Sequence, residues 1–151
     1  MKIRILSPWR QDALYKNKED EYLKRLRKDA SIEVEEIKGE KGDDRDALKS
    51  EGRKLLSRTG KGSYLVVLTE GGKSFESLSF SKWFEGMALK GRSNITFILG
   101  SSAGFDKDVI EKADMLLSLS SLTFPHQLAR VVLIEQIYRA FTLIKGSPYH
   151  K

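Results

Sequence analysis

Three short segments rich in glycine and serine each follow an apolar run: Thr69–Ser74, Gly100–Phe105 and Ser120–Pro125. Because glycine has no Cβ, the backbone of such a segment can approach a ligand closely. Each segment alone is best interpreted as an ordinary turn, whereas three at successive strand ends favour one shared ligand pocket. Their residues suit a neutral or weakly charged cofactor held by backbone groups in an apolar cleft.

The residue types exclude several other kinds of active site. The 151 residues include no cysteine and only two histidines, His126 and His150. Cysteine nucleophiles, disulfides and thiolate metal sites are therefore excluded, and we expect no metal site at all. The G-x-G-x-x-G and G-x-x-x-x-G-K-[ST] phosphate-binding motifs are absent from the sequence. A hydrolase that pairs Ser120 or Ser121 with His126 stays open, but no acidic partner occurs at a recognisable spacing.

The charge balance indicates a polyanionic partner without requiring one. Lys and Arg number 27 against 21 Asp and Glu, which gives a net charge of +6. RNA is the natural polyanion to consider, and a solvated surface with spare lysines explains the excess equally well. No apolar run approaches the ~18–20 residues of a membrane span, and residues 1–7 do not resemble a signal peptide. We therefore expect no membrane partner and a cytoplasmic location.

The elements that would position these segments alternate between strand and helix. Apolar or alternating runs predict strands at residues 3–6, 32–37, 64–68, 95–99 and 115–119. Apolar residues at helical spacing predict helices at residues 16–28, 44–58, 75–89, 106–112 and about 125–144. This alternation predicts one α/β domain over residues 1–151, with a mostly parallel sheet and helices on both faces.

The last predicted helix is apolar on almost every side. Either a homodimer interface or burial in a single larger core would explain this. Within the helix, Glu135 and Arg139 are four residues apart, and a structural ion pair is their simpler role. Arg130 comes one turn after His126, near the predicted pocket, and is a candidate functional residue.

The C-terminal residues Pro148-Tyr-His-Lys151 combine an aromatic ring, an imidazole and an ammonium group. Tyr149 and His150 have the chemistry to stack on unpaired bases, and Lys151 can pair with a phosphate. A frayed polar terminus is the simpler interpretation of such a tail taken alone.

Several motifs together resemble one bacterial family. They are Leu117-Ser-Leu-Ser-Ser-Leu-Thr-Phe-Pro-His-Gln-Leu-Ala-Arg130, then Glu135, Tyr138-Arg-Ala140 and Pro148-Tyr-His150. The family is ribosomal RNA large subunit methyltransferase H, of the SPOUT class, which methylates N3 of a pseudouridine in 23S rRNA. The resemblance covers the whole chain. It implies a C-terminal trefoil knot over about residues 64–145, a homodimer, S-adenosylmethionine as cofactor and the assembled ribosome as substrate.

The resemblance also implies roles for individual residues. Cofactor contacts fall on Leu68, Gly100, Leu119, Ser120, Ser121, Leu122, Thr123 and Phe124. Catalytic roles fall on Arg130, Tyr149 and His150, and RNA contacts on His126 and Lys151. We expect Arg130 or His150 to stabilise negative charge on the base carbonyls.

Two residues depart from the family pattern. Ser101 stands where the family usually has a second glycine, and Lys151 follows His150 where the family often has arginine. Lysine keeps the charge of arginine but not its planar fork of donors. A non-catalytic RNA-binding dimer of the same fold is therefore the alternative function, with Ser101 as a trace of lost catalysis.

Overall fold

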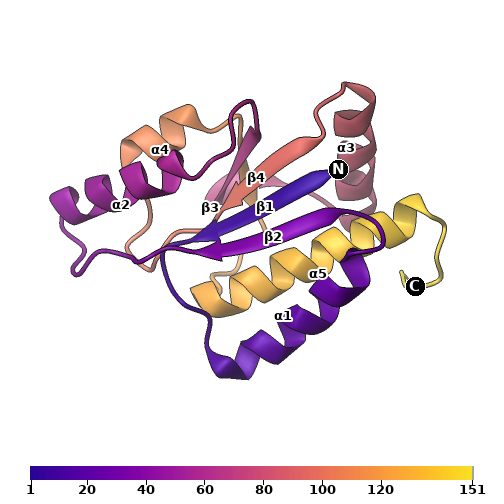
Figure 1. Cartoon of the computed structure of the whole chain (residues 1–151), viewed down its shortest axis with the longest axis horizontal. Helices are drawn as coiled ribbons and strands as arrows, with labels where there is room; N and C mark the ends of the chain where they lie inside the picture. Colours follow the sequence, from indigo (N-terminus) through magenta and orange to yellow (C-terminus); the bar gives the residue numbers. More distant parts are fainter. Residues whose placement is uncertain (151) are drawn as a thin grey trace.

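Five parallel strands form one sheet, in the order β2-β1-β4-β3-β5, in the computed structural model, which describes residues 1–150 (Figure 1). The strands are β1 (Lys2–Ser7), β2 (Ser31–Glu36), β3 (Tyr64–Ser74), β4 (Asn94–Ile98) and β5 (Met115–Ser118). The helices are α1 (Ala13–Leu26), α2 (Arg45–Ser57), α3 (Ser77–Leu89), α4 (Lys107–Lys112) and α5 (His126–Ile144). The predicted alternation of strand and helix in an α/β fold is confirmed.

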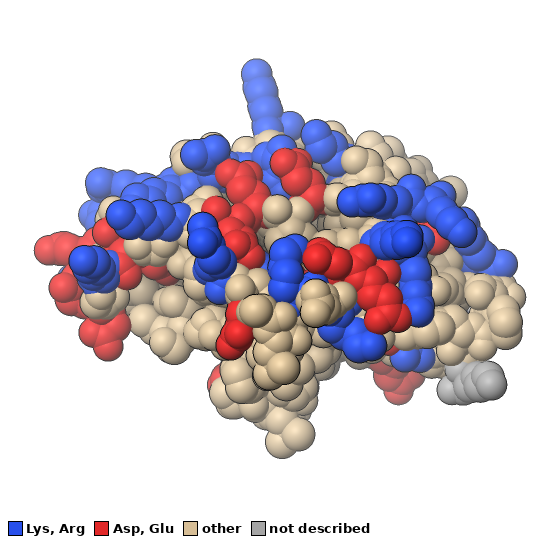
Figure 2. All heavy atoms as spheres, turned by 60° about the horizontal axis from the view of Figure 1, so that its bottom comes forward, with Lys and Arg blue, Asp and Glu red and all other residues tan. Residues whose placement is uncertain are grey.

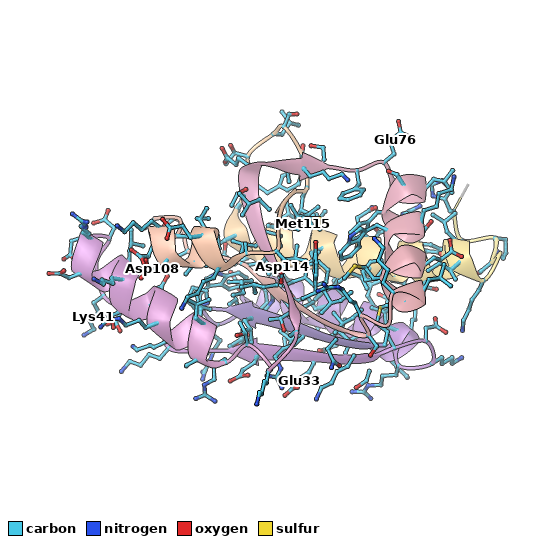
Figure 3. All side chains as sticks on the ribbon, turned by 90° about the horizontal axis from the view of Figure 1, so that it is seen from above. Glu33, Lys41, Glu76, Asp108, Asp114 and Met115 are labelled. Atoms are coloured by element: carbon cyan, nitrogen blue, oxygen red, sulfur yellow. The ribbon has the colours of Figure 1, made fainter. Side chains whose placement is uncertain are left out.

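Helices cover both faces of the sheet, so its central strands bury side chains on both sides. Ile5 joins the larger core with α1, α3 and α5, whereas its neighbour Leu6 joins the smaller core with α2 and α4. In Figure 3, where Asp108 marks α4 and Glu76 the start of α3, α2 and α4 lie on the opposite side of the molecule from α3. Side chains of Asp12, Asp44 and Asp106 accept hydrogen bonds at the first turns of α1, α2 and α4.

The apolar character of α5 has a cause within a single chain. The helix packs against both α1 and α3, and buries Leu133, Ile134 and Ile137 completely. No residue of α5 is exposed. Burial in one core, the second interpretation offered by the sequence, therefore accounts for most of this helix, and the homodimer stays a prediction.

The end of β3 differs from its prediction. The sequence predicted a strand ending at Leu68 and a loop over Thr69–Ser74, whereas β3 continues to Ser74. Its pairing with β5 shifts register between Leu68 and Lys73, so the intervening residues bulge out of the ladder. Gly72 permits this path, because a Cβ on it would lie 2.6 Å from the backbone nitrogen of Leu117. Part of the predicted loop is therefore a bulged strand.

Two further features of the chain bear on the predictions. Among residues 1–150, no helix combines the length and the apolarity needed to cross a bilayer.

The strand order places β4 between β1 and β3, and adds β5 beyond β3. The trefoil knot and its range of about residues 64–145 stay predictions.

Candidate active site

A cavity of about 800 Å³ lies beside the bulge of β3 and the segments that follow β4 and β5. It is lined by residues from all three predicted segments, namely Thr69, Glu70, Gly100, Ser101, Ser102, Gly104, Phe105, Ser120, Leu122, Thr123, Phe124 and Pro125, together with Leu68, Leu99, Ile110, Leu117, Ser118, Leu119, His126 and Ala129. The three segments therefore meet at one cavity, as the sequence predicted.

Most residues expected to contact a cofactor line this cavity, and Ser121, which is exposed, does not. Gly100 cannot be enlarged freely, because a Cβ would lie 3.0 Å from the Phe105 ring. Thr123 Oγ1 donates to Glu70 Oε1 at 2.8 Å, which joins the segment after β5 to the bulge of β3. The cavity thus has glycine, hydroxyl and apolar groups on its walls and one carboxylate among its lining residues.

Ser101 fits its position without backbone strain. Gly104 N donates to Ser101 O at 3.0 Å and closes a tight turn. Within that turn Gly104 takes the left-handed conformation, with φ of +83°, whereas no non-glycine residue among 1–150 has a positive φ. The turn therefore requires glycine at position 104 and accepts serine at position 101.

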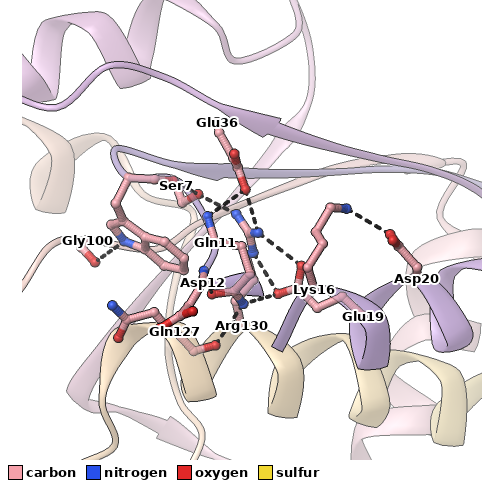
Figure 4. Close-up of polar contacts among 11 residues, drawn as sticks. Ser7, Gln11, Asp12, Lys16, Glu19, Asp20, Glu36, Gly100, Gln127 and Arg130 are labelled. Atoms are coloured by element: carbon pink, nitrogen blue, oxygen red, sulfur yellow. Dashed lines mark hydrogen bonds and ion pairs between the residues drawn. The ribbon is translucent and has the colours of Figure 1, made fainter. Parts of the chain in front are cut away.

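Arg130 is completely buried and forms the centre of a hydrogen-bonded network (Figure 4). Its Nε donates to Glu19 Oε1 at 2.8 Å and its Nη2 to Glu19 Oε2 at 3.0 Å. The guanidinium also donates to Ser7 Oγ at 2.8 Å and to Glu36 Oε1 at 2.7 Å. Arg130 thereby joins α5 to α1, β1 and β2, and it is not among the residues that line the cavity.

Electrostatics favour the charged forms of Arg130 and Glu36. Burial lowers the pKa of the Arg130 guanidinium, but its hydrogen bonds to Glu19 and Glu36 outweigh burial and raise that pKa above its usual value. Burial likewise raises the pKa of Glu36, and the hydrogen bond from Arg130 outweighs it, so the pKa is lowered. Gln11 supports the network by donating through its side chain to Glu19. Nothing local in the sequence indicated this network, because its members come from distant segments.

The tail residues Tyr149 and His150 form a second polar cluster with Glu135 and Arg139 of α5. Arg139 Nη2 donates to Glu135 Oε1 at 2.6 Å, which confirms the predicted ion pair. Tyr149 Oη donates to the same Glu135 oxygen at 3.1 Å, and the Arg139 guanidinium lies 4.9 Å from the Tyr149 ring centroid. His150 Nδ1 lies 3.2 Å from Arg139 Nη1. Burial, together with Tyr22 and Glu135, raises the pKa of the Tyr149 hydroxyl far above its usual value.

The cavity and the tail cluster contact different parts of α5. His126 at the first residue of the helix lines the cavity, whereas Tyr149 and His150 follow its last turn. The tail folds back along the helix, so that Tyr149 reaches Glu135, which lies nine residues after His126 and thus roughly 13.5 Å further along the helix axis, given a rise of ~1.5 Å per residue. The two groups of predicted site residues therefore do not meet within one chain. Lys151, the predicted phosphate contact, lies outside the described residues.

The geometry does not support the Ser–His hydrolase. Ser120 Oγ accepts a hydrogen bond from Leu122 N at 2.9 Å. The His126 ring packs on Trp9, with ring centroids 4.7 Å apart. Within residues 1–150 no hydrogen bond joins His126 to Ser120. The same residues also contain no cluster of three His, Asp or Glu side chains that could hold a metal ion.

Comparisons with known proteins cover the whole chain. The family model described as "Predicted SPOUT methyltransferase" matches residues 1–150. The chain belongs to the SPOUT methyltransferase family. Proteins named Ribosomal RNA large subunit methyltransferase H, from Ruminiclostridium cellulolyticum and Streptococcus thermophilus, are 43% and 41% identical to it over 100% of both chains. The protein of that name from Enterococcus faecalis is 40% identical over 87% of both chains.

SPOUT methyltransferases use S-adenosylmethionine, and this cavity fits that cofactor. Its volume lies within the ~300–1,000 Å³ range of small-molecule sites. Thr69 Oγ1, in a residue of the cavity wall, is buried and has no hydrogen-bond partner among residues 1–150, so it is available to a polar ligand group. The first turn of α5 has no side-chain cap, which leaves backbone N–H groups beside the cavity wall at His126. The SPOUT methyltransferase thus combines an apolar cleft with a few polar groups, as the sequence predicted.

Proposed function

We propose that this enzyme methylates N3 of a pseudouridine in 23S rRNA of the assembled ribosome, acting in the cytoplasm as a homodimer. The names of relatives about 40% identical over the full chain support rRNA as the substrate. The observation that carries the homodimer is the separation of the cavity from the tail along α5. A second copy is required to bring the tail of one subunit to the cavity of the other.

The cavity residues hold the cofactor in this proposal. Leu68, Gly100, Leu119, Ser120, Leu122, Thr123 and Phe124 contact S-adenosylmethionine, mainly through backbone groups and apolar side chains. When bound, the cofactor supplies an electrophilic methyl group. The chain's own contribution is to exclude water and to hold the acceptor nitrogen in line with that group.

Tyr149 and His150 are the proposed contacts to the target base. Arg139 lies beside both rings, so its cation can oppose negative charge that develops on the base carbonyls as N3 loses its proton. Arg130 is fully committed to Glu19, Glu36 and Ser7, so we assign it the role of positioning α5 rather than of touching the base. His126 at the cavity wall and Lys151 are the further proposed RNA contacts.

Surface charge is compatible with an RNA partner of defined structure. Figure 2 shows Lys and Arg side chains interspersed with Asp and Glu on the face that it draws. A net charge of +6 attracts phosphate, but mixed charges weaken indiscriminate binding to any RNA. This distribution favours recognition through the tail and the shape of the substrate.

Ser101 does not favour the alternative of a non-catalytic RNA-binding dimer. That alternative takes Ser101 as a trace of lost catalysis. The turn, however, accepts serine without a left-handed backbone, and Ser101 still lines an open cavity. Saturable binding of S-adenosylmethionine in calorimetry would support the enzyme, and its absence would support the binding dimer.

Mixed dimers of two inactive variants test the shared site. Gly100→Val fills the cavity beside Phe105, and Tyr149→Ala removes the tail ring. Each variant alone should fail to methylate ribosomes. Refolding or co-expressing the two together forms dimers in which one cavity is intact and faces an intact tail. With random pairing, half of the dimers are mixed, and each mixed dimer has one complete site where the wild-type dimer has two. The mixture should therefore show about a quarter of the wild-type rate.

Three outcomes are informative. Recovery of methyl transfer, with the product located by mass spectrometry of 23S rRNA, supports the proposal. No recovery from verified mixed dimers would show that each chain uses its own tail. A methyl group on another nucleotide would refute the proposed target while leaving methyl transfer intact.

A further inference from the structure

Trp9, in the segment between β1 and α1, contacts two walls of the cofactor cavity at once. Its indole Nε1–H donates to Gly100 O at 3.0 Å, across 91 residues of sequence. Its ring packs against the His126 imidazole, with centroids 4.7 Å apart. Gly100 and His126 both line the cavity, whereas Trp9 does not. One side chain outside the cavity therefore touches the segment after β4 and the start of α5.

The hydrogen bond to Gly100 fixes the direction of a peptide group. The C=O and N–H of a trans peptide point in opposite directions, and no peptide bond among residues 1–150 is cis. Holding the Gly100 carbonyl toward Trp9 thus sets the direction of the Ser101 N–H, in a residue of the cavity wall. Glycine at position 100 has no side chain to steady the turn, so an external contact is needed to do so.

The ring of Trp9 is itself held in place by the buried network. The Arg130 guanidinium lies 4.7 Å from the Trp9 ring centroid, a cation–π contact. Ser7 Oγ donates to Trp9 O at 3.2 Å and accepts from Arg130 Nη1. Trp9 is therefore fixed on one side by groups that take no part in binding, and it presents its N–H and ring to the cavity walls.

We propose that Trp9 is a positioning residue of the cofactor site, which orients the Gly100–Ser101 peptide through its N–H and the His126 ring through its face. This inference rests on the proposed use of the cavity for S-adenosylmethionine. Loss of the N–H alone should weaken cofactor binding while leaving the fold and the rate at saturation almost unchanged.

The chain offers a matched control, because Trp83 is its other tryptophan and packs among Phe80, Phe84 and Phe97 in the core. Trp9→Phe keeps an aromatic ring and removes the indole N–H, and Trp83→Phe makes the same change away from the cavity. Calorimetry with S-adenosylhomocysteine should show about 2–10-fold weaker binding to Trp9→Phe, the range expected for one hydrogen bond. Its KM for S-adenosylmethionine should rise by a similar factor with kcat within about twofold. Trp83→Phe should bind as the wild type does.

Fluorescence gives a second reading that leaves Trp9 unaltered. In Trp83→Phe the only indole is Trp9, and its emission should change when S-adenosylhomocysteine binds. In Trp9→Phe the emission of Trp83 should not respond. Equal affinities of Trp9→Phe and the wild type, or a silent Trp9 emission on binding, would overturn the positioning role. An equal loss of affinity in both variants would also overturn it, because a general loss of stability would then suffice. A wild-type protein that binds no S-adenosylhomocysteine would refute the proposed function instead.

Discussion

Arg130 on α5 and Glu19 on α1 form a doubly hydrogen-bonded ion pair in which both side chains are completely buried. The two residues are 111 positions apart, so the pair joins the first helix to the last. Breaking such a pair leaves one buried charge without a partner, which is costly, whereas an exposed pair contributes little.

The first prediction concerns Arg130→Met. We expect the free energy of unfolding to fall by about 3–5 kcal/mol, because Glu19 stays buried without its counter-charge. Urea denaturation measures this loss. Arg25→Met, which removes an exposed ion pair with Glu21, is the control and should cost less than about 1 kcal/mol. A stable Arg130→Met protein that binds cofactor but fails to methylate would instead give Arg130 the catalytic role that the sequence suggested.

The second prediction uses two adjacent glycines of the β3 bulge. A Cβ at Gly72 would lie 2.6 Å from the backbone of Leu116 and Leu117, whereas a Cβ at Gly71 would meet nothing within 4 Å. Gly72→Ala should therefore cost about 1–3 kcal/mol of stability through overpacking, and Gly71→Ala should cost little. Thermal unfolding and cofactor titration of the two variants compare them directly. Equal behaviour would mean that the bulge relaxes freely around residue 72.

The third prediction concerns pH. Burial lowers the pKa of the His126 imidazole from its usual value of 6.5. The unfolded chain therefore takes up a proton at a higher pH than the folded chain does, so stability should fall as the pH drops below about 6.5. Urea midpoints measured at several pH values should show this fall, and His126→Asn should reduce it. The same substitution at exposed His150 is the control, and identical pH profiles for wild type and His126→Asn would refute the prediction.

The fourth prediction separates the two unusual positions in the segment after β4. Ser101→Gly should leave cofactor affinity within about threefold of the wild type, because Ser101 already has a backbone conformation open to any residue. Gly104→Ala should lose about 1–2 kcal/mol, because alanine would have to adopt a φ of +83°. Chemical denaturation measures the loss at Gly104, and calorimetry the affinity at Ser101. A large gain in affinity from Ser101→Gly would favour the interpretation of Ser101 as a trace of lost catalysis.

The spacing of apolar residues predicted the strands and helices well, because each of these elements buries its own apolar face. The continuous apolar run from Tyr64 to Leu68 marks a strand covered on both sides, and Asp106 marks the start of α4. The same local reasoning failed after Leu68, because polar residues and glycines look like a loop even where a bulged strand resumes its pairing at Lys73. Only the register against β5 distinguishes the two.

The residues of the cavity wall could be predicted in outline from the sequence, whereas the Arg130 network and the Trp9 contact could not. Three glycine- and serine-rich segments at strand ends indicated a shared pocket, since parallel strands end at one edge of the sheet. The partners of Arg130 gave no such signal, because Glu19 and Glu36 precede it by 111 and 94 residues and belong to charged stretches that look solvated. Trp9 was overlooked for the same reason, since no spacing rule connects it to Gly100.

The position of β1 in the sheet has a consequence for the order in which the molecule can be assembled. β1 leaves the ribosome before the other four strands of the sheet, yet it pairs with β4, which starts at Asn94. More than half of the described chain must therefore be synthesised before β1 can pair along both of its edges. Such pairing between distant segments slows folding. Because β5 and α5 emerge later still and both contribute residues to the cavity, a nascent chain has no complete cavity until α5 has been synthesised.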